Sequence, residues 1–299
     1  MYLVEFDKAG AEWAVVAYAS GDARMIEVMQ GTESPHVITG KLISGAPADL
    51  IKREDEFLQH MTDPDELMRG RAKHVPELLD GEYFLPRSMT IRQAGKKSNH
   101  GLNYRMKYRR FALETGLAEA DARTIVESYL TQAYPNIPVW WSLIERQLEK
   151  GRALTNCFGR KRVFYGQWGV ELFEQATAFI PQSTIADVVH RATIAYWDAR
   201  NEVCLNKIEL LAQSGDSLLM QWTAPERLMH LVLAAQEIAL DFLNPLMEYG
   251  GREFRIRTDV TIGQSWGHMI PWKVTESLEE TQTSLNEALE MLHGTQKAS

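Results

Sequence analysis

Four side chains in one short segment constrain the fold more than any other feature of the sequence. Arg92, Lys96, His100 and Tyr104 follow one another at intervals of four residues. Because an α-helix places residues i and i+4 on the same side, this spacing predicts a helix with two cations and two rings on one face. Guanidinium and ammonium groups bind phosphate oxygens, while rings cover a sugar or a base. The segment therefore indicates a binding face for a nucleoside triphosphate.

The composition is that of an ordinary globular protein. Of the 299 residues, 45% are apolar and 24% are charged, which allows one substantial core or two small ones. No apolar run approaches the ~20 residues that span a bilayer, so we expect no membrane association. The first residues lack the basic start and apolar stretch of a signal peptide. Cys157 and Cys204 are the only cysteines and form no metal-spaced pair, which favours a reducing, cytoplasmic environment.

Charge is distributed unevenly along the chain. The formal net charge of −8 argues mildly against nucleic-acid binding. However, basic residues crowd the segments 87–110 and 146–162, and acidic residues concentrate in 54–82 and 276–290. Basic runs are commonly solvated helix faces. Their segregation from the acids here fits a phosphate-lined cleft better.

The order of predicted elements favours a mixed α/β (α+β) fold with few strands. Residues 2–7 and 255–262 are typical of strands, and residues 151–168 and 209–222 of hairpins. Apolar spacing predicts helices at 12–30 (broken at Gly21), 91–112, 118–133, 140–150, 173–200 and 224–249. Strands and helices do not alternate regularly, so a doubly wound parallel sheet is not expected. The tail from residue 275 is polar and compatible with either a helix or a loop.

Several blocks resemble family A DNA polymerases, the family of bacterial DNA polymerase I, in the expected order. The segment 92–104 is similar to the fingers helix of that family, R-x3-K-x3-F/Y-G-x2-Y. Residues 7–12 resemble its motif D-x-S-x-x-E, and residues 211–217 its V-H-D-E hairpin. Residues 155–162 and 259–266 are similar to its T-x2-G-R-R-R stretch and closing strand. The departures from the family include the missing Ser of the first motif, Ala178 for Asn, His100 for Phe or Tyr, Arg105 for Gly, Gly215 for His and Ser217 for Glu.

The resemblance implies templated DNA synthesis by a two-metal mechanism. Asp7 and Asp216 would bridge two Mg²⁺ ions, or Mn²⁺ in their place, with the backbone carbonyl of Lys8 as a further ligand. Lys96 would protonate the leaving pyrophosphate. The residues implied to bind the incoming deoxynucleoside triphosphate are Glu12, His36, Arg92, Lys96, His100 and Tyr104. Those implied to contact primer-template DNA are Asn99, Thr155, Arg160, Arg162, Gln182 and Ser217.

The resemblance also implies a division into parts. We expect a polymerase palm with a small antiparallel sheet at 1–43 and 151–273, an irregular insertion at 44–90, helical fingers at 91–150 and a tail at 274–299. The thumb and the exonuclease domain are absent from this arrangement. The chain is then a fragment or half of a split enzyme, for example a phage-encoded one. We therefore expect a partner chain that supplies the thumb and the remaining palm, in the cytoplasm of a cell or of an infected bacterial host.

Three alternatives stay open. The changes at Gly215 and Ser217 favour a catalytically weakened or inactive relative that acts as a DNA-binding or assembly subunit. An unrelated α/β nucleotide-binding domain lacks support, because neither G-x-x-x-x-G-K-S/T nor G-x-G-x-x-G occurs. RNA synthesis is the third, and Glu12 argues for deoxynucleotides instead.

Overall fold

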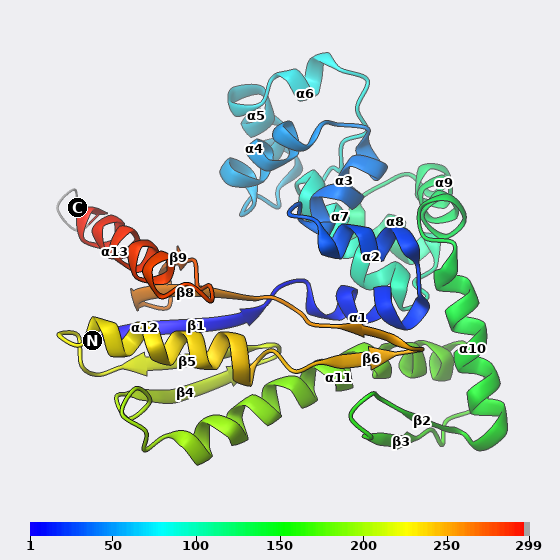
Figure 1. Cartoon of the computed structure of the whole chain (residues 1–299). Coiled ribbons are helices and arrows are strands. Elements are labelled where there is room, and N and C mark those ends of the chain that lie inside the picture. The colour runs from blue at the N-terminus through cyan, green and yellow to red at the C-terminus, as the bar shows by residue number, and fades with distance from the viewer. Residues whose placement is uncertain (296–299) are drawn as a thin grey trace. The chain divides into compact units, whose positions relative to one another are not determined.

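The computed structural model describes residues 1–295, which form two compact units (Figure 1). The sheet unit consists of residues 1–11, 182–248 and those from 253 onward, and the helical unit of residues 12–181 and 249–252. The chain passes from the helical unit to the sheet unit inside one long helix, α11 (Val170–Ala199). No helix within the described residues is both long and apolar enough to span a membrane.

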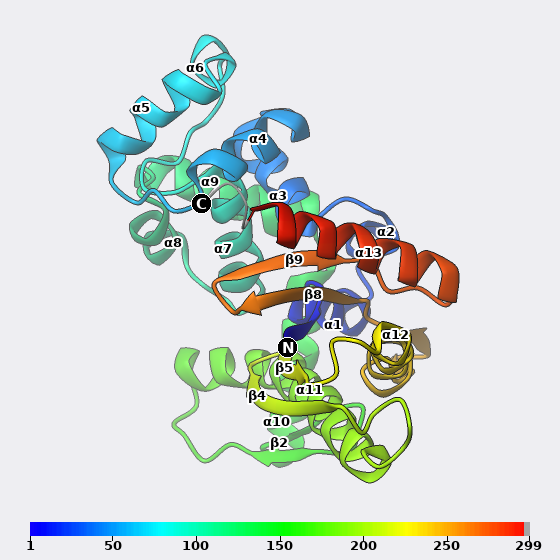
Figure 2. The ribbon, with the colours of Figure 1, turned by 90° about the vertical axis from the view of Figure 1, so that its left-hand side faces the viewer.

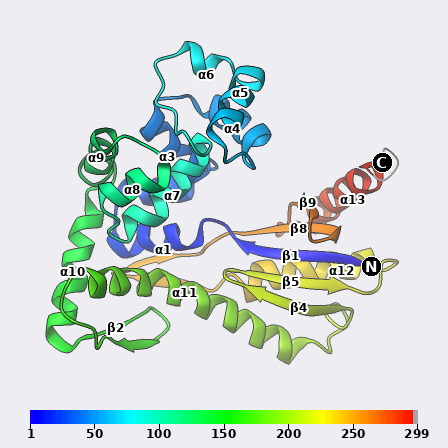
Figure 3. The same cartoon turned by 180° about the vertical axis from the view of Figure 1, so that it is seen from behind.

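An antiparallel sheet of five strands forms the centre of the sheet unit. In spatial order the strands are β4 (Ile208–Ser214), β5 (Ser217–Trp222), β1 (Tyr2–Lys8), β8 (Thr258–Ser265) and β9 (His268–Trp272). Figure 3 shows β1 between β5 and β8. Val4 and Phe6 are fully buried, whereas Glu5 and Asp7 are not, as expected of a strand with one face on a core. The small antiparallel sheet predicted from the sequence is confirmed.

The helices of the sheet unit are α12 (Leu228–Gln236), the π-helix η2 (Glu237–Phe242), α13 (Leu278–Thr295) and the second part of α11. α13 lies beside β9 (Figure 2), where the indole N–H of Trp272 donates to the carbonyl of Thr281 at 3.0 Å. At the opposite edge, the hydroxyl of Tyr196 on α11 donates to the carbonyl of Ile208 on β4 at 2.7 Å. Both edge strands of the sheet are therefore tied to a helix.

The helical unit holds a set of short helices and one hairpin. Apart from the segment 44–90 and the first part of α11, they are α1 (Ala11–Ser20), α2 (Ala23–Gln30), α3 (Pro35–Ser44), α7 (Ile91–Asn103), α8 (Tyr108–Thr115), α9 (Glu119–Ser128), the π-helix η1 (Tyr129–Ala133), α10 (Asn136–Gly151), β2 (Ala153–Thr155) and β3 (Lys161–Val163). α3 and α7 approach closely at Gly95, where a Cβ atom would lie 2.2 Å from the carbonyl oxygen of His36. Glycine at this position is what allows His36 to lie against α7.

The segment 44–90 folds into three helices, α4 (Ala48–Leu58), α5 (Pro64–His74) and α6 (Glu77–Asp80). Leucines from all three helices are buried and pack with Ile91 of α7; they are Leu50, Leu58, Leu67 and Leu78. Because α7 supplies part of this core, the segment is anchored on the helix that carries the predicted triphosphate-binding face.

Two predicted helices end earlier than expected. The helix predicted at 91–112 stops at Asn103, because Arg105 adopts a left-handed backbone with φ of 69° that a helix does not accommodate. The helix predicted at 224–249 ends at Phe242. Gly250 and Gly251, both with positive φ, instead form the turn between β6 (Met247–Tyr249) and β7 (Arg252–Phe254).

The strands near the C-terminus also differ from expectation. The strand predicted at 255–262 begins at Thr258, and β9 was not predicted at all. Pro271 lies within β9, and proline lowers the expectation of a strand except at a sheet edge, where β9 lies. Within the described residues the polar tail forms α13, so the helical alternative is the one observed there, and residues 296–299 of the tail lie outside the described part of the chain.

Candidate active site

The predicted acids Asp7 and Asp216 lie beside each other at one end of the sheet. Asp7 pairs with Ser217 on β5 and with Asp259 on β8. Directly opposed residues of antiparallel strands share a face, so these three side chains form a row across the sheet. Asp216 precedes Ser217 in the β4–β5 turn, and its carbonyl accepts from the backbone N–H of Lys8 at 3.3 Å. The turn begins at Gly215, whose φ of 60° is what a type II′ hairpin takes at this position.

The side chain of Lys8 is buried and lies on the opposite face of the sheet from the row formed by Asp7, Ser217 and Asp259. Its Nζ donates to the carbonyl of Leu243 at 2.7 Å, to the hydroxyl of Thr258 at 2.9 Å and to the carbonyl of Ile256. Burial lowers the pKa of Lys8 to about 7, although the nearby carboxylates of Asp259 and Asp7 act in the opposite direction. Lys8 thereby ties the end of β1 to the start of β8 and to the residue after η2, which fixes the strand that carries Asp7.

The acids at this end of the sheet suit a hard divalent cation. Neighbouring strands lie about 4.8 Å apart, so carboxylates on adjacent strands can share ions that are ~3.5–4 Å apart. Mg²⁺ is usually held by one or two carboxylates, together with substrate phosphates and water. Asp7 and Asp216, which the contact from the Lys8 N–H to the Asp216 carbonyl brings next to each other, therefore fit the predicted metal ligands in donor type.

In the helical unit, α7 has the predicted open face. Lys96 and His100 are exposed and Arg92 and Tyr104 are partly exposed, whereas Ala94, Gly95, Ser98 and Leu102 are buried. Thr90 caps the helix, since its hydroxyl accepts from the Gln93 N–H at 3.3 Å and the Gln93 side chain accepts from the Thr90 N–H. Arg92, Lys96 and His100 therefore lie on one side of a capped helix, and Tyr104 follows directly after its last residue.

Three of the predicted nucleotide-binding residues form a hydrogen-bonded cluster. The hydroxyl of Tyr104 donates to Oε2 of Glu12, and Nδ1 of His100 lies 3.6 Å from the same oxygen. Burial raises the pKa of Glu12, but the bonds from His100 and Tyr104 outweigh it and lower that pKa overall. The pKa of the Tyr104 hydroxyl is raised well above its ordinary value, first by burial and then by Glu12. Glu12 is thus a carboxylate and Tyr104 a hydrogen-bond donor.

His36 completes this cluster, and its ring centroid lies 6.1 Å from that of His100. Burial lowers the pKa of His36 to about 3, with further contributions from Arg92, His100 and Lys96. Its Nδ1 is 3.1 Å from the side-chain amide of Asn99, which suits a neutral ring that accepts. His36 is therefore uncharged in the folded protein at neutral pH.

The pKa of His36 leads to a prediction for stability. Because the folded value is about 3 and the ordinary value is 6.5, the unfolded chain binds the proton first as the pH falls. The free energy of unfolding should therefore decrease between pH 6.5 and 4. We expect His36→Gln to remove about 1–3 kcal/mol of that decrease. Urea unfolding of both proteins across this range measures it, and identical pH dependence of the two proteins would contradict it.

Asn99, which the sequence predicted to contact DNA, lies in the interior of the helical unit and not on the open face of α7. Asn99 is 2% exposed on the buried side of α7. Its side-chain oxygen accepts from the hydroxyls of Thr39 at 2.8 Å and Tyr129 at 3.1 Å, and its amide donates to the carbonyl of Pro35 at 3.2 Å. Asn99 instead fixes α3 and η1 against α7, a role that the one-face spacing did not reveal.

Ser217 also differs from its predicted role in DNA contact. It is 5% exposed, and its hydroxyl donates to Glu5 at 3.2 Å and to the carbonyl of Ser214 at 3.1 Å. The other predicted DNA contacts are exposed: Thr155, Arg160 and Arg162 on the β2–β3 hairpin, and Gln182 on α11. The guanidinium of Arg162 lies 4.8 Å from the Phe164 ring and donates to Gln175 at 3.1 Å, so its direction is fixed.

A contact that the sequence did not reveal involves Arg92. Its Nη1 lies 3.1 Å from Oδ2 of Asp55 on α4. The two residues are far apart in the sequence, and no spacing rule connects them. The only signal in the sequence was the pair of adjacent acids, Glu54 and Asp55, within a segment of unknown purpose.

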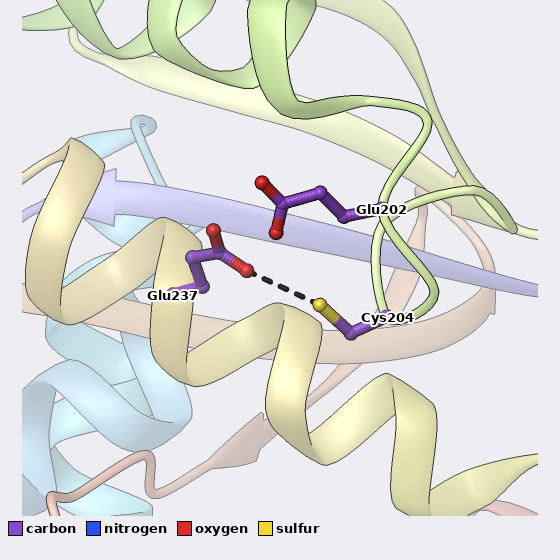
Figure 4. A group of neighbouring side chains, drawn as sticks. All are labelled: Glu202, Cys204 and Glu237. Carbon is purple, nitrogen blue, oxygen red and sulfur yellow. Dashed lines mark hydrogen bonds between the residues drawn. The ribbon is translucent and has the colours of Figure 1, made fainter.

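One other group among the described residues has the composition of a metal site, namely Glu202, Cys204 and Glu237 (Figure 4). The thiol of Cys204 donates to Oε2 of Glu237 at 3.2 Å. Burial and Glu237 raise the pKa of Cys204 to about 11, so the sulfur keeps its proton. A thiolate is the form that binds metal, and this arrangement favours the thiol instead.

The chain is similar to known proteins of one family. The family described as DNA polymerase family A matches residues 86–268. The thermostable DNA polymerase I of Thermus thermophilus is 25% identical over 273 residues, which cover 88% of this chain and 27% of that protein. The thermostable DNA polymerase I of Thermus aquaticus is 24% identical over the same length and coverage. The chain thus spans about a quarter of the length of these relatives.

A solved structure shows the same fold. It is the POL domain of Pol1 from M. smegmatis in complex with DNA primer-template and dNTP. The TM-score is 0.63 at 19% sequence identity, and the match covers 89% of this chain and 40% of that one. At this identity the likeness concerns the fold alone.

Proposed function

The chain belongs to DNA polymerase family A, and from this premise we propose that it carries out templated DNA synthesis as the palm and fingers part of such an enzyme. The observation that carries the proposal is the hairpin contact between Asp216 and Lys8, which brings Asp216 beside Asp7. Deoxynucleotides would be added to a primer 3′-hydroxyl. In this proposal the palm comprises residues 1–43 and 151–273, and the fingers residues 91–150.

The sheet unit would hold the catalytic ions. Asp7 and Asp216, with the carbonyl of Lys8, are the proposed ligands of two Mg²⁺ ions, or of Mn²⁺. When bound there, such ions offset charge on the attacking and leaving oxygens of the transfer. The buried side chain of Lys8 keeps β1 in place while Asp7 binds.

The helical unit would hold the triphosphate and the sugar. Arg92 and Lys96 bind phosphate oxygens, and Lys96 donates a proton to the leaving pyrophosphate. Glu12, kept in place by Tyr104, lies under the sugar and excludes a 2′-hydroxyl. His100 stacks where the family usually has Phe or Tyr. Arg160, Arg162 and Gln182 contact the primer-template, with Gln182 in the minor groove, where acceptors are nearly independent of sequence.

We propose further that a partner chain supplies the thumb and the rest of the palm. Duplex affinity comes mostly from phosphate contacts, and a larger protein surface provides more of them. The expected location is the cytoplasm of a cell or of an infected bacterial host.

A second candidate is a DNA-binding or assembly subunit with weakened chemistry. It is favoured by Ser217, which stands where the family has an acid and is bonded to Glu5 and the Ser214 carbonyl. Primer extension with Mg²⁺ and the four deoxynucleoside triphosphates separates the two. We expect extension that follows the template and prefers deoxynucleotides over ribonucleotides. Tight primer-template binding without extension, also after addition of the partner chain, would favour the subunit.

A further inference from the structure

Two adjacent acids of α4 reach the start of α7, the helix that carries the proposed phosphate-binding cations. Glu54 is fully buried. Its Oε2 accepts from the backbone N–H of Ile91 at 2.7 Å, and its Oε1 accepts from Nε of Arg71 at 2.7 Å. Arg71, also fully buried, donates to the carbonyls of Pro86 at 2.8 Å and Met89 at 3.1 Å. Glu54 and Arg71 therefore fix the chain as it enters α7.

Asp55 makes a different pair of contacts. Its Oδ1 accepts from the hydroxyl of Thr90 at 2.7 Å, and its Oδ2 lies 3.1 Å from Nη1 of Arg92. The side chain of Asp55 is 11% exposed and that of Arg92 is 35% exposed. Asp55 therefore binds the guanidinium through Nη1, while part of the Arg92 side chain remains open to solvent.

The contact with Arg92 is not needed to cap the helix. The capping box of Thr90 and Gln93 and the bond from Ile91 to Glu54 already satisfy N–H groups of the first turn. A guanidinium has five N–H donors in a planar fork, and the contact with Asp55 uses one of them. The remaining donors keep a fixed direction, which lowers the entropy lost when a phosphate binds.

We propose that Asp55 is a positioning residue for the triphosphate, acting through Arg92, so that the segment 44–90 sets nucleotide affinity. This inference rests on the proposed function, because it takes Arg92 as a phosphate ligand. Asp55→Asn keeps an acceptor for Thr90 but presents an amide N–H group or a neutral oxygen to Arg92. Without the charged partner, the guanidinium loses its preferred direction.

The test is a double-mutant cycle with the triphosphate dATP and Mg²⁺. Isothermal titration gives the Kd, and steady-state primer extension gives KM and kcat separately. We expect Asp55→Asn to raise Kd and KM about two- to tenfold, the cost of ordering one free side chain, with kcat changed by less than about twofold. In the Arg92→Ala background, Asp55→Asn should have no further effect. Glu56→Gln, which removes one charge from an exposed position of α4, is the matched control and should leave all three constants unchanged.

Each of the other outcomes would contradict the role of Asp55, the proposed function, or both. Equal Kd values for the parent and Asp55→Asn would overturn the inference, as would effects that add in the Arg92→Ala background. A fall in kcat without a rise in Kd would assign Asp55 to the stability of the fold instead. A parent chain that binds dATP but does not extend primers would overturn the proposed function only, and the Kd comparison would still decide the role of Asp55. A parent chain that does not bind dATP would overturn both.

Discussion

Replacement of Asp7 or Asp216 by Asn should reduce nucleotide incorporation by at least about 10³-fold, since a metal held by carboxylates contributes several kcal/mol to transition-state stabilisation. Asn keeps the size of the side chain but not its charge, so the ions lose a ligand while β1 and the β4–β5 turn persist. Affinity for primer-template should change less than about threefold, because it depends mainly on contacts between cations and phosphates. Single-turnover extension gives the first quantity and fluorescence anisotropy with labelled DNA gives the second.

The control for this pair is Asp241→Asn. Asp241 is an exposed acid of the same sheet unit, on η2, and its loss changes the net charge by the same amount. Activity close to that of the parent is expected for this variant. A chain with Asn at position 7 or 216 that extends primers at the parental rate would exclude the two-metal assignment.

The second large effect is expected at Lys96. Removal of its ammonium group by Lys96→Ala deletes a phosphate ligand and the proposed proton donor. We therefore expect both a higher KM for the triphosphate and a lower kcat, with kcat/KM reduced about 10²- to 10³-fold. Steady-state extension at varied triphosphate concentration separates the two constants.

Lys97 is the matched control for Lys96. It is also exposed on α7, but its Nζ donates to the carbonyl of Glu114 at 3.1 Å, on another side of the helix. Lys97→Ala should change kcat/KM by less than about threefold. If the two lysine variants lost activity equally, a general effect of positive charge would replace the specific role of Lys96.

Much of what the sequence predicted depended on the intervals between residues within a single helix or hairpin. The four-residue interval in α7 fixes a helical face whatever surrounds it, so the open side with Arg92 and Lys96 was predictable. The Gly215-Asp216 pair between two apolar runs predicted a hairpin, and strand β1 ended at an acid. Only the family resemblance, however, indicated that Asp7 and Asp216 would meet, because strand neighbours are not encoded by spacing.

Contacts between distant segments could not be predicted in the same way. Asp55 reaches Arg92 only because α4 and α7 share a buried core, and this core depends on the packing of leucines from three helices. Asn99 looked available on a polar helix, yet hydroxyls from η1 and α3 surround it. The early end of α7 depends on the positive φ of Arg105. It was not predicted, because a sequence pattern does not indicate which non-glycine residue will adopt a positive φ.

We propose above all that Asp7 and Asp216 together hold divalent ions. Electron paramagnetic resonance of Mn²⁺ titrated into the parent chain, Asp216→Asn and Glu237→Gln tests it most directly, without dependence on activity. We expect Asp216→Asn to weaken or remove Mn²⁺ binding, whereas Glu237→Gln, in the group with Cys204, should leave the binding isotherm unchanged. Mn²⁺ binding that survives in Asp216→Asn and disappears in Glu237→Gln would contradict it.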